Sequence, residues 1–357
     1  MSGAGSIRSP GGRAGRVSAR ARRAEGTVAS PAKENAVNII LMLAVAVVGV
    51  PLLLVGYIRL SEPLAGRKPR RAALMRPWLW LAPTLVLLAV FLVYPVVATM
   101  VESLENADST AWVGLSNYAA VFTSPDNLSA LGNNVLWLVF FTLGTLLFGL
   151  LVAVLSDRVR YESAVKALVF IPMAISFVAA GIIWKFMFEF QPAGEIQVGT
   201  VNAALTAAVP GFKPIAWLVN TTTNNAALIA VGVWMWTGFA MVILSAAIKA
   251  IPPDVVEAAK IDGASELQIF RLVTLPLVAP TLGFVATTLM INVLKVFDIV
   301  YVMTNGNLGT DVIANRMYKE MFNYHNTGLA SAIATFLLIC IVPVMIVNIR
   351  RYRRGVA

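Results

Sequence analysis

The sequence predicts an all-α protein, a bundle of helices that cross a membrane. Of its 357 residues, 58% are hydrophobic and only 13% are charged, and the mean hydropathy is +0.77. Soluble domains carry about 25% charged residues. Seven apolar runs are long enough to span a bilayer as helices, at 37–58, 78–101, 133–155, 164–188, 227–248, 277–300 and 329–349. Runs of this length do not alternate as the strands of a membrane barrel do, so helices are expected.

The N-terminal tail is basic and nearly free of large apolar side chains. Residues 1–36 carry seven Lys and Arg among Gly, Ser, Ala and Pro, a composition typical of disorder. The run at 37–58 starts too late and is too long for a cleaved signal peptide. We favour a single span there, although Gly49-Val50-Pro51 also permits a kinked or re-entrant segment. Residues 37–76 therefore form an extra transmembrane or re-entrant segment followed by a basic cytoplasmic linker.

The basic residues concentrate in alternate loops. The loops at 59–77, 156–167 and 249–275 hold six, three and three Lys or Arg, and the tail after 349 holds four. The intervening loops at 102–132, 189–226 and 301–328 hold none, one and two. Because basic loops face the cytoplasm, the loop after 249 and the C-terminus are expected there. A single span at 37–58 would place the basic tail outside, against this rule, whereas the re-entrant alternative keeps it inside. The net charge of +10 thus reflects membrane topology, and we expect no nucleic-acid partner.

The residues that usually carry enzyme chemistry are scarce. Cys340 is the one cysteine, so no internal disulfide can form, and His325 is the one histidine. Neither can belong to a Cys/His metal cluster. No Ser/His/Asp arrangement and no glycine-rich phosphate-binding motif stands out. We therefore expect no catalytic residue, no metal site and no cofactor in this chain.

A polar segment between the fifth and sixth apolar runs carries strong helix signals. This segment, Ile251–Leu277, is called the polar loop below. Pro252-Pro253 ends the preceding helix, and Asp254 is expected to cap a helix at Val255–Ile261, with Glu257 completing an acidic capping box. A loop that only joined two spans would need no such order.

The second half of the polar loop is equally well specified. Gly263 follows the expected helix at the position where a positive φ is favourable. Ser265 and Gln268 form a second capping box, and Leu275-Pro276 is expected to turn the chain into the next span. Small side chains at Ala258 and Ala259 permit close approach of a partner. The alternative is an amphipathic hairpin lying on lipid headgroups.

These features resemble the EAA loop of permeases from ATP-binding-cassette importers. The resemblance covers residues 77–354 and favours the larger permease subunit of the carbohydrate-uptake branch, of the maltose and alpha-glucoside type. Its motifs are Glu257-Ala258-Ala259, Gly263, Val273-Thr274-Leu275-Pro276, Trp80-Leu81-Ala82-Pro83, Tyr94-Pro95, Gly114-Leu115-Ser116-Asn117-Tyr118, Phe170-Ile171-Pro172, Phe297-Asp298-Ile299-Val300-Tyr301 and Thr304-Asn305-Gly306. The family usually has Ile where Val273 stands. The fold implied is a six-helix importer permease core plus the N-terminal apolar segment.

The resemblance implies a multi-pass subunit of a bacterial plasma membrane importer. Its partners would be a second permease, a dimer of ATP-binding-cassette ATPases, an extracellular solute-binding protein and a sugar, namely an oligosaccharide or alpha-glucoside. ATP and magnesium would bind to the ATPase, which would grip the polar loop at Glu257, Ala258, Ala259, Asp262 and Gly263.

Polar residues inside spans are costly and point to a substrate path. Asn292, Lys295, Val296 and Ile299 are expected on one face of the span after the polar loop. Lys295 and Asp298 are alternatively a structural ion pair. The span before the polar loop offers Trp234, Trp236 and Thr237 as a lining for a sugar ring. The resemblance places the sugar near Gly232, Met235, Trp236, Phe239, Asn292, Val293 and Val296.

Several alternatives stay open from the sequence. Trp112, Tyr118 and Trp217 in the outer loops either contact the binding protein or anchor the chain at the membrane interface. A permease for polyamines or amino acids is a second hypothesis, although a polyamine path should be lined by carboxylates and only Asp298 is available. A secondary transporter would show internal symmetry, and no repeat is evident.

Overall fold

The computed structural model describes residues 42, 48–64, 69–157 and 159–356. The predicted tail at 1–36, residues 37–41 and 43–47 of the run at 37–58, and Arg158 lie outside them. The chain divides into two compact units, Met1–Val93 and Tyr94–Ala357. Each unit is described by itself.

Three elements of the first unit have their full bounds within the described residues. They are α3 (Val50–Leu64), α4 (Pro69–Leu88) and η2 (Ala89–Val93). The hydroxyl of Tyr57 on α3 donates to the carbonyl of Leu79 on α4. Much of the predicted cytoplasmic linker is helical, because α3 continues to Leu64 and α4 begins at Pro69.

The second unit is helical throughout, and the one strand-like pairing among its described residues is an isolated bridge between Glu105 and Trp112. Its α-helices are α5 (Tyr94–Glu102), α6 (Ser116–Thr123), α7 (Pro125–Leu136), α8 (Thr142–Ser156), α9 (Glu162–Phe170), α10 (Phe177–Met187), α11 (Thr200–Ala208), α12 (Asn224–Lys249), α13 (Pro253–Ile261), α14 (Glu266–Ile269), α15 (Leu275–Leu294), α16 (Asp298–Met303), α17 (Ile313–Tyr318) and α18 (Thr327–Val356). Shorter 3-10 or π segments are η3 (Trp137–Phe141), η4 (Ile171–Ala174), η5 (Phe270–Thr274) and η6 (Lys319–Asn323).

Five helical stretches of the described residues are long and apolar enough to cross a membrane. They are Ala73–Glu102, Pro125–Ser156, Asn224–Lys249, Glu266–Leu294 and Thr327–Arg350. A sixth crossing is formed if the bent pair Glu162–Ala174 and Phe177–Met187 counts as one span. These stretches coincide with the last six apolar runs of the sequence, so the predicted helical membrane fold is confirmed.

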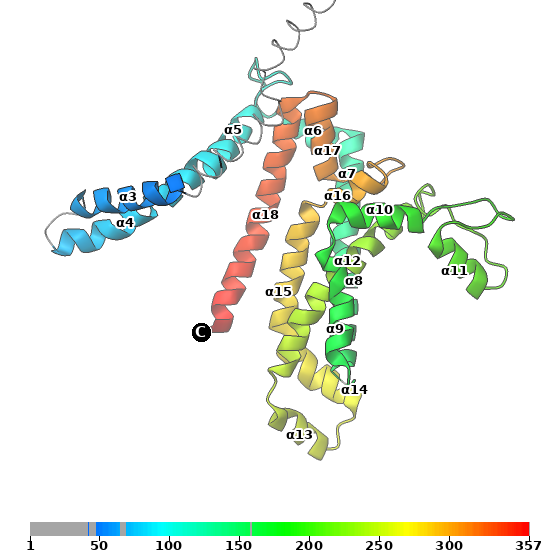
Figure 1. The fold of residues 1–357 in the computed structure, drawn as a ribbon. Coiled ribbons are helices and arrows are strands. Elements are labelled where there is room, and N and C mark those ends of the chain that lie inside the picture. Colours follow the sequence, from blue (N-terminus) through cyan, green and yellow to red (C-terminus); the bar gives the residue numbers. More distant parts are fainter. Residues whose placement is uncertain (1–41, 43–47, 65–68, 158, 357) are drawn as a thin grey trace, which may run out of the picture. The chain divides into compact units, whose positions relative to one another are not determined.

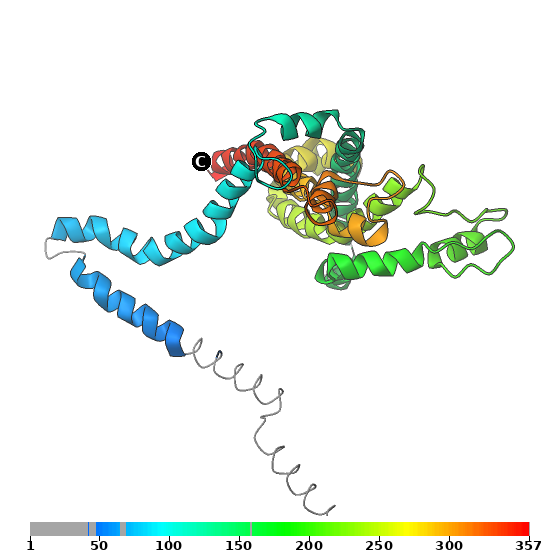
Figure 2. The ribbon, with the colours of Figure 1, turned by 90° about the horizontal axis from the view of Figure 1, so that it is seen from above.

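The apolar run at 164–188 is not one continuous helix, because its two halves meet at 101°. Pro172 lies at the start of the 3-10 turn η4, where its missing amide disfavours continued α-helix. Ser176 then caps α10 by accepting a hydrogen bond from the amide of Ala179, at 3.1 Å. In Figures 1 and 2, α10 leaves the second unit sideways toward α11.

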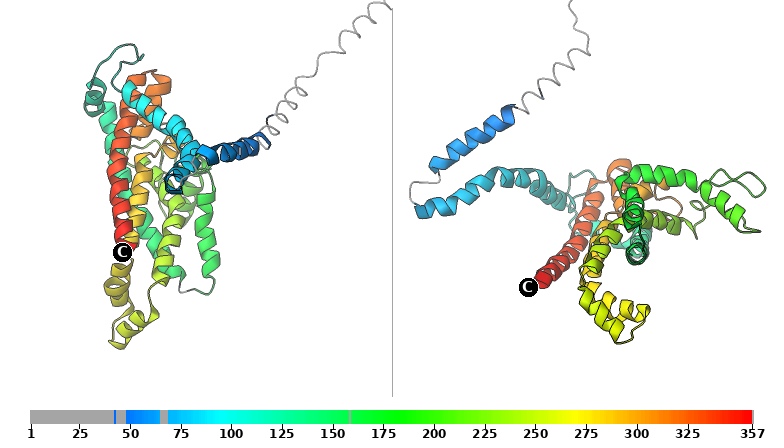
Figure 3. Two further views of the ribbon diagram at one scale, coloured as in Figure 1. Left: turned by 90° about the vertical axis from the view of Figure 1, so that its left-hand side faces the viewer. Right: turned by 60° about the horizontal axis from the view of Figure 1, so that its bottom comes forward.

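Helix α12 is the centre of the second unit and packs most extensively against α8. Its buried side chains include Leu228, Val231, Met241 and Leu244. In Figures 1 and 3 it runs alongside α8, α9 and α15, and α13 lies beyond the ends of these helices. The polar loop therefore projects from one end of the helix bundle.

Glycines permit the closest approaches of α12. A Cβ atom on Gly149 of α8 would lie 2.5 Å from Cβ of Ala240. One on Gly238 would lie 2.6 Å from the carbonyl oxygen of Val169 on α9. Small residues at helix contacts let backbones approach closely, which is how helices pack in membranes. Helices α8, α9 and α12 consequently form one tightly packed group.

Candidate functional site

The first helix of the polar loop begins earlier than the sequence predicted. Helix α13 starts at Pro253, and Pro252 stands at the cap position with extended ψ. The predicted cap at Asp254 is therefore wrong, because a proline is favoured in the first helical turn, where its missing amide costs nothing. Asp254 lies in that first turn, where a carboxylate interacts favourably with the helix dipole. Glu257 is exposed and has no capping role.

The turn after α13 has the conformation that the sequence predicted. Gly263 has φ +81°, the left-handed region that favours glycine. Its amide donates to the carbonyl of Lys260 at 3.0 Å, and the amide of Ala264 donates to the carbonyl of Ala259 at 3.0 Å. This pair of hydrogen bonds is a Schellman motif, which satisfies the last carbonyls of a helix. Asp262 is the C-cap residue.

The second capping box is confirmed, but the predicted turn at Leu275-Pro276 is wrong. The amide of Ser265 donates to Oε1 of Gln268 at 2.7 Å, and Oγ of Ser265 accepts from the amide of Gln268 at 3.4 Å. From there the helix is continuous from Glu266 to Leu294. The π segment η5 lies directly before Pro276, and its altered hydrogen-bonding pattern accommodates a residue without an amide hydrogen. The chain therefore passes this proline without a turn.

The polar loop presents apolar side chains to its surroundings. Ile261 is 86% exposed, Leu272 73% and Leu267 65%. None of the residues of α13 is buried. One exposed aliphatic side chain is ordinary on a protein surface, whereas three on one short, well-capped segment form an apolar surface that suits a partner or the lipid headgroups.

A cavity of about 330 Å³ lies between the helices that flank the polar loop. Its lining residues are Trp137, Phe141, Phe177, Gly232, Trp236, Asn292, Val293, Lys295, Val296, Phe297, Asp298 and Ile299. Six of the eight residues predicted for the substrate path line it: Gly232, Trp236, Asn292, Val293, Lys295 and Val296. The other two do not. Met235 is fully buried in the core, and Phe239 packs on the ring of Trp236 with centroids 5.4 Å apart.

The predicted single helical face at 292–299 is wrong, because the helix breaks there. Helix α15 ends at Leu294, Lys295 is its C-cap, and α16 begins at Asp298. The ring of Phe297 stacks on Tyr301 at 5.0 Å and packs against Tyr318 at 5.3 Å. This packing turns the chain through the break. The break, rather than helical periodicity, brings Lys295, Val296 and Asp298 to the cavity.

Asn134 of α7 links the end of α15, just before the break, to the start of α17. Its carboxamide oxygen accepts from the amide of Ile313 at 2.8 Å, and its Nδ2 donates to the carbonyl of Val293 at 3.4 Å. Asn134 is buried. The sequence analysis missed this residue, although adjacent asparagines in an apolar run are a signal of buried polar contacts.

Five of the twelve residues that line the cavity are aromatic. The indole of Trp236 lies near Phe141 at 6.5 Å and near Phe177 at 6.3 Å between ring centroids. A Cβ atom on Gly232 would lie 3.0 Å from the ring of Trp137, so only glycine leaves room for that ring. The sequence analysis missed Trp137, Phe141 and Phe177 because they come from two other helical stretches.

Three polar side chains are set among these rings. Nδ2 of Asn292 donates to the carbonyl of Thr288 at 2.9 Å, and its carboxamide oxygen has no hydrogen-bond partner among the described residues. Lys295 and Asp298 are exposed, and within the described part of the chain neither takes part in an ion pair. The cavity thus presents an amide, an ammonium and a carboxylate beside aromatic faces.

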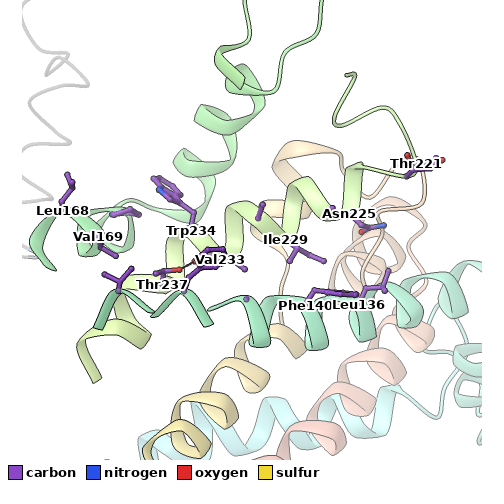
Figure 4. Close-up of a pocket in the computed structure, with 17 residues that line it drawn as sticks. Leu136, Phe140, Leu168, Val169, Thr221, Asn225, Ile229, Val233, Trp234 and Thr237 are labelled. Atoms are coloured by element: carbon purple, nitrogen blue, oxygen red, sulfur yellow. Dashed lines mark hydrogen bonds between the residues drawn. The ribbon is translucent and has the colours of Figure 1, made fainter. Parts of the chain in front are cut away.

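A larger groove of about 950 Å³ runs along another face of α12 (Figure 4). Ile229, Val233 and Trp234 line it from α12, and Leu136 and Phe140 line it from the adjoining helix. Thr237, also in its lining, already donates to the carbonyl of Val233 at 2.7 Å. Because the groove offers few polar groups, it fits a sugar less well than the aromatic cavity does.

Two of the three outer-loop aromatics are held by internal contacts. The hydroxyls of Tyr118 and Ser103 are hydrogen bonded at 2.7 Å. The indole N–H of Trp217 donates to Oδ1 of Asn202 at 3.0 Å. Trp112 is 64% exposed. Contact of these residues with a binding protein stays a prediction.

The family model and the relatives that match this chain all describe membrane components of transport systems. Residues 145–353 match the family model described as "Binding-protein-dependent transport system inner membrane component". The chain is 52% identical to the osmoprotective compounds uptake permease protein GgtC of Synechocystis sp., over 77% of this chain and 98% of GgtC. It is 44% identical to the alpha-glucoside transport system permease protein AglF of Rhizobium meliloti, over 82% of this chain and 86% of AglF.

A solved structure shares the fold. The structure of a bacterial ABC transporter involved in the import of the acidic polysaccharide alginate contains a chain with a TM-score of 0.68 and 23% identity. The similarity covers 80% of this chain and 99% of that one. At this identity the likeness concerns the fold.

Proposed function

The chain belongs to the family of binding-protein-dependent transport system inner membrane components, and on that premise we propose that it is the permease of a sugar importer driven by a separate ATPase. It supplies the membrane path and no chemistry. Among the described residues no group of His, Cys, Asp and Glu could hold a metal ion. ATP and magnesium are bound by the partner ATPase.

The polar loop is the coupling element of this proposal. Its exposed apolar residues and its capped, turn-locked backbone suit docking into a protein cleft. Glu257, Ala258 and Ala259 lie on α13, and the Schellman turn at Asp262 and Gly263 fixes the angle between α13 and α14. A rigid element of this kind transmits movement of the ATPase to α12 and α15, the spans on either side.

The aromatic cavity is the proposed sugar site, and it is the observation that carries the proposal. Sugar rings present C–H surfaces that pack on aromatic faces and hydroxyl groups that hydrogen bond to amides. Trp236, Phe141 and Phe177 supply the faces, and Asn292 supplies an unpartnered amide oxygen. A volume of about 330 Å³ fits a small solute.

An uncharged alpha-glucoside is the proposed substrate class. The cavity lining contains one ammonium, Lys295, and one carboxylate, Asp298, so it favours neither an anion nor a cation. A polyamine path would need several carboxylates. GgtC and AglF are named for the uptake of osmoprotective compounds and for the transport of alpha-glucosides.

The proposed assembly contains a second permease subunit, two ATPase subunits and an extracellular binding protein. The polar loop and the C-terminus lie in the cytoplasm in this arrangement, as the distribution of Lys and Arg predicts. The membrane is the plasma membrane of a bacterium.

A test of the sugar site uses the complete complex reconstituted in proteoliposomes. Asn292→Leu removes the amide and leaves a side chain of similar size, so KM for sugar uptake should rise roughly 5- to 10-fold. Assembly and ATP hydrolysis in detergent should be unchanged. Lys213→Met, at an exposed site in an outer loop, is the control. Unchanged uptake kinetics in Asn292→Leu would exclude the cavity as the sugar site.

A further inference from the structure

A charged cluster lies at the end of α12 that leads into the polar loop. Its members, called the Lys166 cluster, are Asp157, Glu162, Lys166, Ser245 and Lys249. Asp157 is the C-cap of α8, Glu162 and Lys166 lie on α9, and Ser245 and Lys249 lie on α12. The cluster therefore joins three helix ends.

Lys166 uses its three N–H donors on three different helices. Its ammonium donates to Oδ1 of Asp157 at 3.0 Å, to Oε1 of Glu162 and to Oγ of Ser245. An ammonium has three N–H groups and no acceptor, so its hydrogen-bonding capacity is filled. The side chain is 19% exposed, as is that of Asp157, which limits competition from water.

Further contacts close the cluster. Oγ of Ser245 donates to Oδ1 of Asp157 at 3.1 Å, and Lys249 pairs with Glu162. The carboxylate of Asp157 lies at the negative end of the α8 dipole, where it is destabilised without a cation beside it. Without Lys166, the one cation among the described residues that pairs with the carboxylates of Asp157 and Glu162 would be Lys249, which is 3.9 Å from Asp157 and half exposed.

The helices that the cluster joins also carry much of the aromatic cavity. Trp137 and Phe141 lie on η3, which continues into α8, and Gly232 and Trp236 lie on α12. Phe177 begins α10, which follows α9 after the bend. The remaining wall, Asn292–Ile299, belongs to α15 and α16, on the other side of the polar loop.

We propose that Lys166 is a positioning residue which locks α8, α9 and α12 into one rigid body. When the polar loop is displaced, these helices then move together relative to α15, and the cavity opens between the two groups. This inference rests on the proposed coupling function of the polar loop. In this proposal Lys166 transmits movement between helices and contacts neither the sugar nor the ATPase.

The test measures the coupling ratio, the amount of sugar imported per ATP hydrolysed, in proteoliposomes of the full complex. Lys166→Met should lower this ratio at least about fivefold, whereas Lys166→Arg, which keeps the charge and several donors, should restore most of it. The ATPase should co-purify normally in both variants, because the polar loop is unchanged. Lys213→Met, a lysine exposed in an outer loop, is the matched control.

A distance measurement separates transmission from general stability. Spin labels at Leu155 on α8 and Val255 on α13, both exposed, are placed in a Cys340→Ser background. With Lys166 present, the separation of the labels should be the same in the nucleotide-free and vanadate-trapped states. In Lys166→Met the separation of the labels should differ between these states.

A normal coupling ratio in Lys166→Met, or a label separation that does not depend on Lys166, would overturn the proposal. Loss of ATPase binding in polar-loop variants is a separate observation that tests the proposed function.

Discussion

Individual glycines decide how closely the helices around the cavity approach. Gly238 is the sharpest case, because a Cβ atom there would lie 2.6 Å from the carbonyl oxygen of Val169 and 2.8 Å from Cα of Phe170. Both atoms belong to the backbone of α9, so no side-chain rotation can relieve the contact. Gly232 makes the corresponding contact with the rings of Trp137 and Phe141.

We predict that Gly238→Ala destabilises the second unit by about 1–3 kcal/mol, the usual cost of overpacking. The gain in helix propensity from glycine to alanine, about 1 kcal/mol, is too small to offset it. Thermal unfolding of the purified chain in detergent should show a lower midpoint. Gly132→Ala on α7, where a Cβ atom meets nothing within 4 Å, should be neutral or stabilising. Equal midpoints for the two variants would contradict the close packing of α12 on α9.

Only part of the cavity could be predicted from single residues. Asn292 and Trp236 stand out because polar or amphipathic side chains in an apolar span need a reason. Trp137, Phe141 and Phe177 look like ordinary apolar residues, and their role depends on which helices meet. The family resemblance placed Met235 near the sugar, but its side chain is buried in the core. Proximity between distant helices is set by packing, which sequence periodicity does not report.

The helices themselves were largely predictable, and their interruptions were not. Six of the seven predicted runs coincide with helical stretches that could cross a membrane, if the bent pair counts as one, and capping signals predicted the positive φ at Gly263 and the capping box at Ser265. The bend at 175–176 and the break at 295–297 escaped prediction, because the apolar runs continue through both. They depend on local contacts, such as the cap by Ser176 and the stacking of Phe297 on Tyr301. At Pro276 the prediction failed in the opposite direction. A turn was predicted there, but the helix continues past this proline, directly after the π segment η5.

At the largest scale, the second unit is organised around two ends of one helical bundle. The polar loop and the Lys166 cluster lie at one end, and the chain between α10 and α12 carries an exposed segment with Ile196 at 91% exposure. The distribution of Lys and Arg predicts that these two regions face opposite sides of the membrane.

Cysteine labelling tests this orientation. In a Cys340→Ser background, Ile261→Cys should react with a membrane-impermeant maleimide only when the cytoplasmic face is open, as in inverted vesicles. Ile196→Cys should react in intact cells. Both side chains are highly exposed, so differences in labelling report the side of the membrane rather than burial. Labelling of Ile261→Cys in intact cells would show that the orientation is the opposite of the predicted one.

The most direct test of the account measures ATP hydrolysis stimulated by loaded binding protein in the reconstituted complex, with Glu257→Lys or Gly263→Pro in this chain. Glu257 is exposed, and proline cannot adopt the φ of +81° found at position 263, so the first change alters the docking surface and the second its shape. We predict that both variants lose stimulation and co-purify poorly with the ATPase, whereas Glu195→Lys, an exposed carboxylate in an outer loop, behaves as the unmodified chain. Normal co-purification and full stimulation in both polar-loop variants would contradict the claim that this loop couples the ATPase to the sugar path.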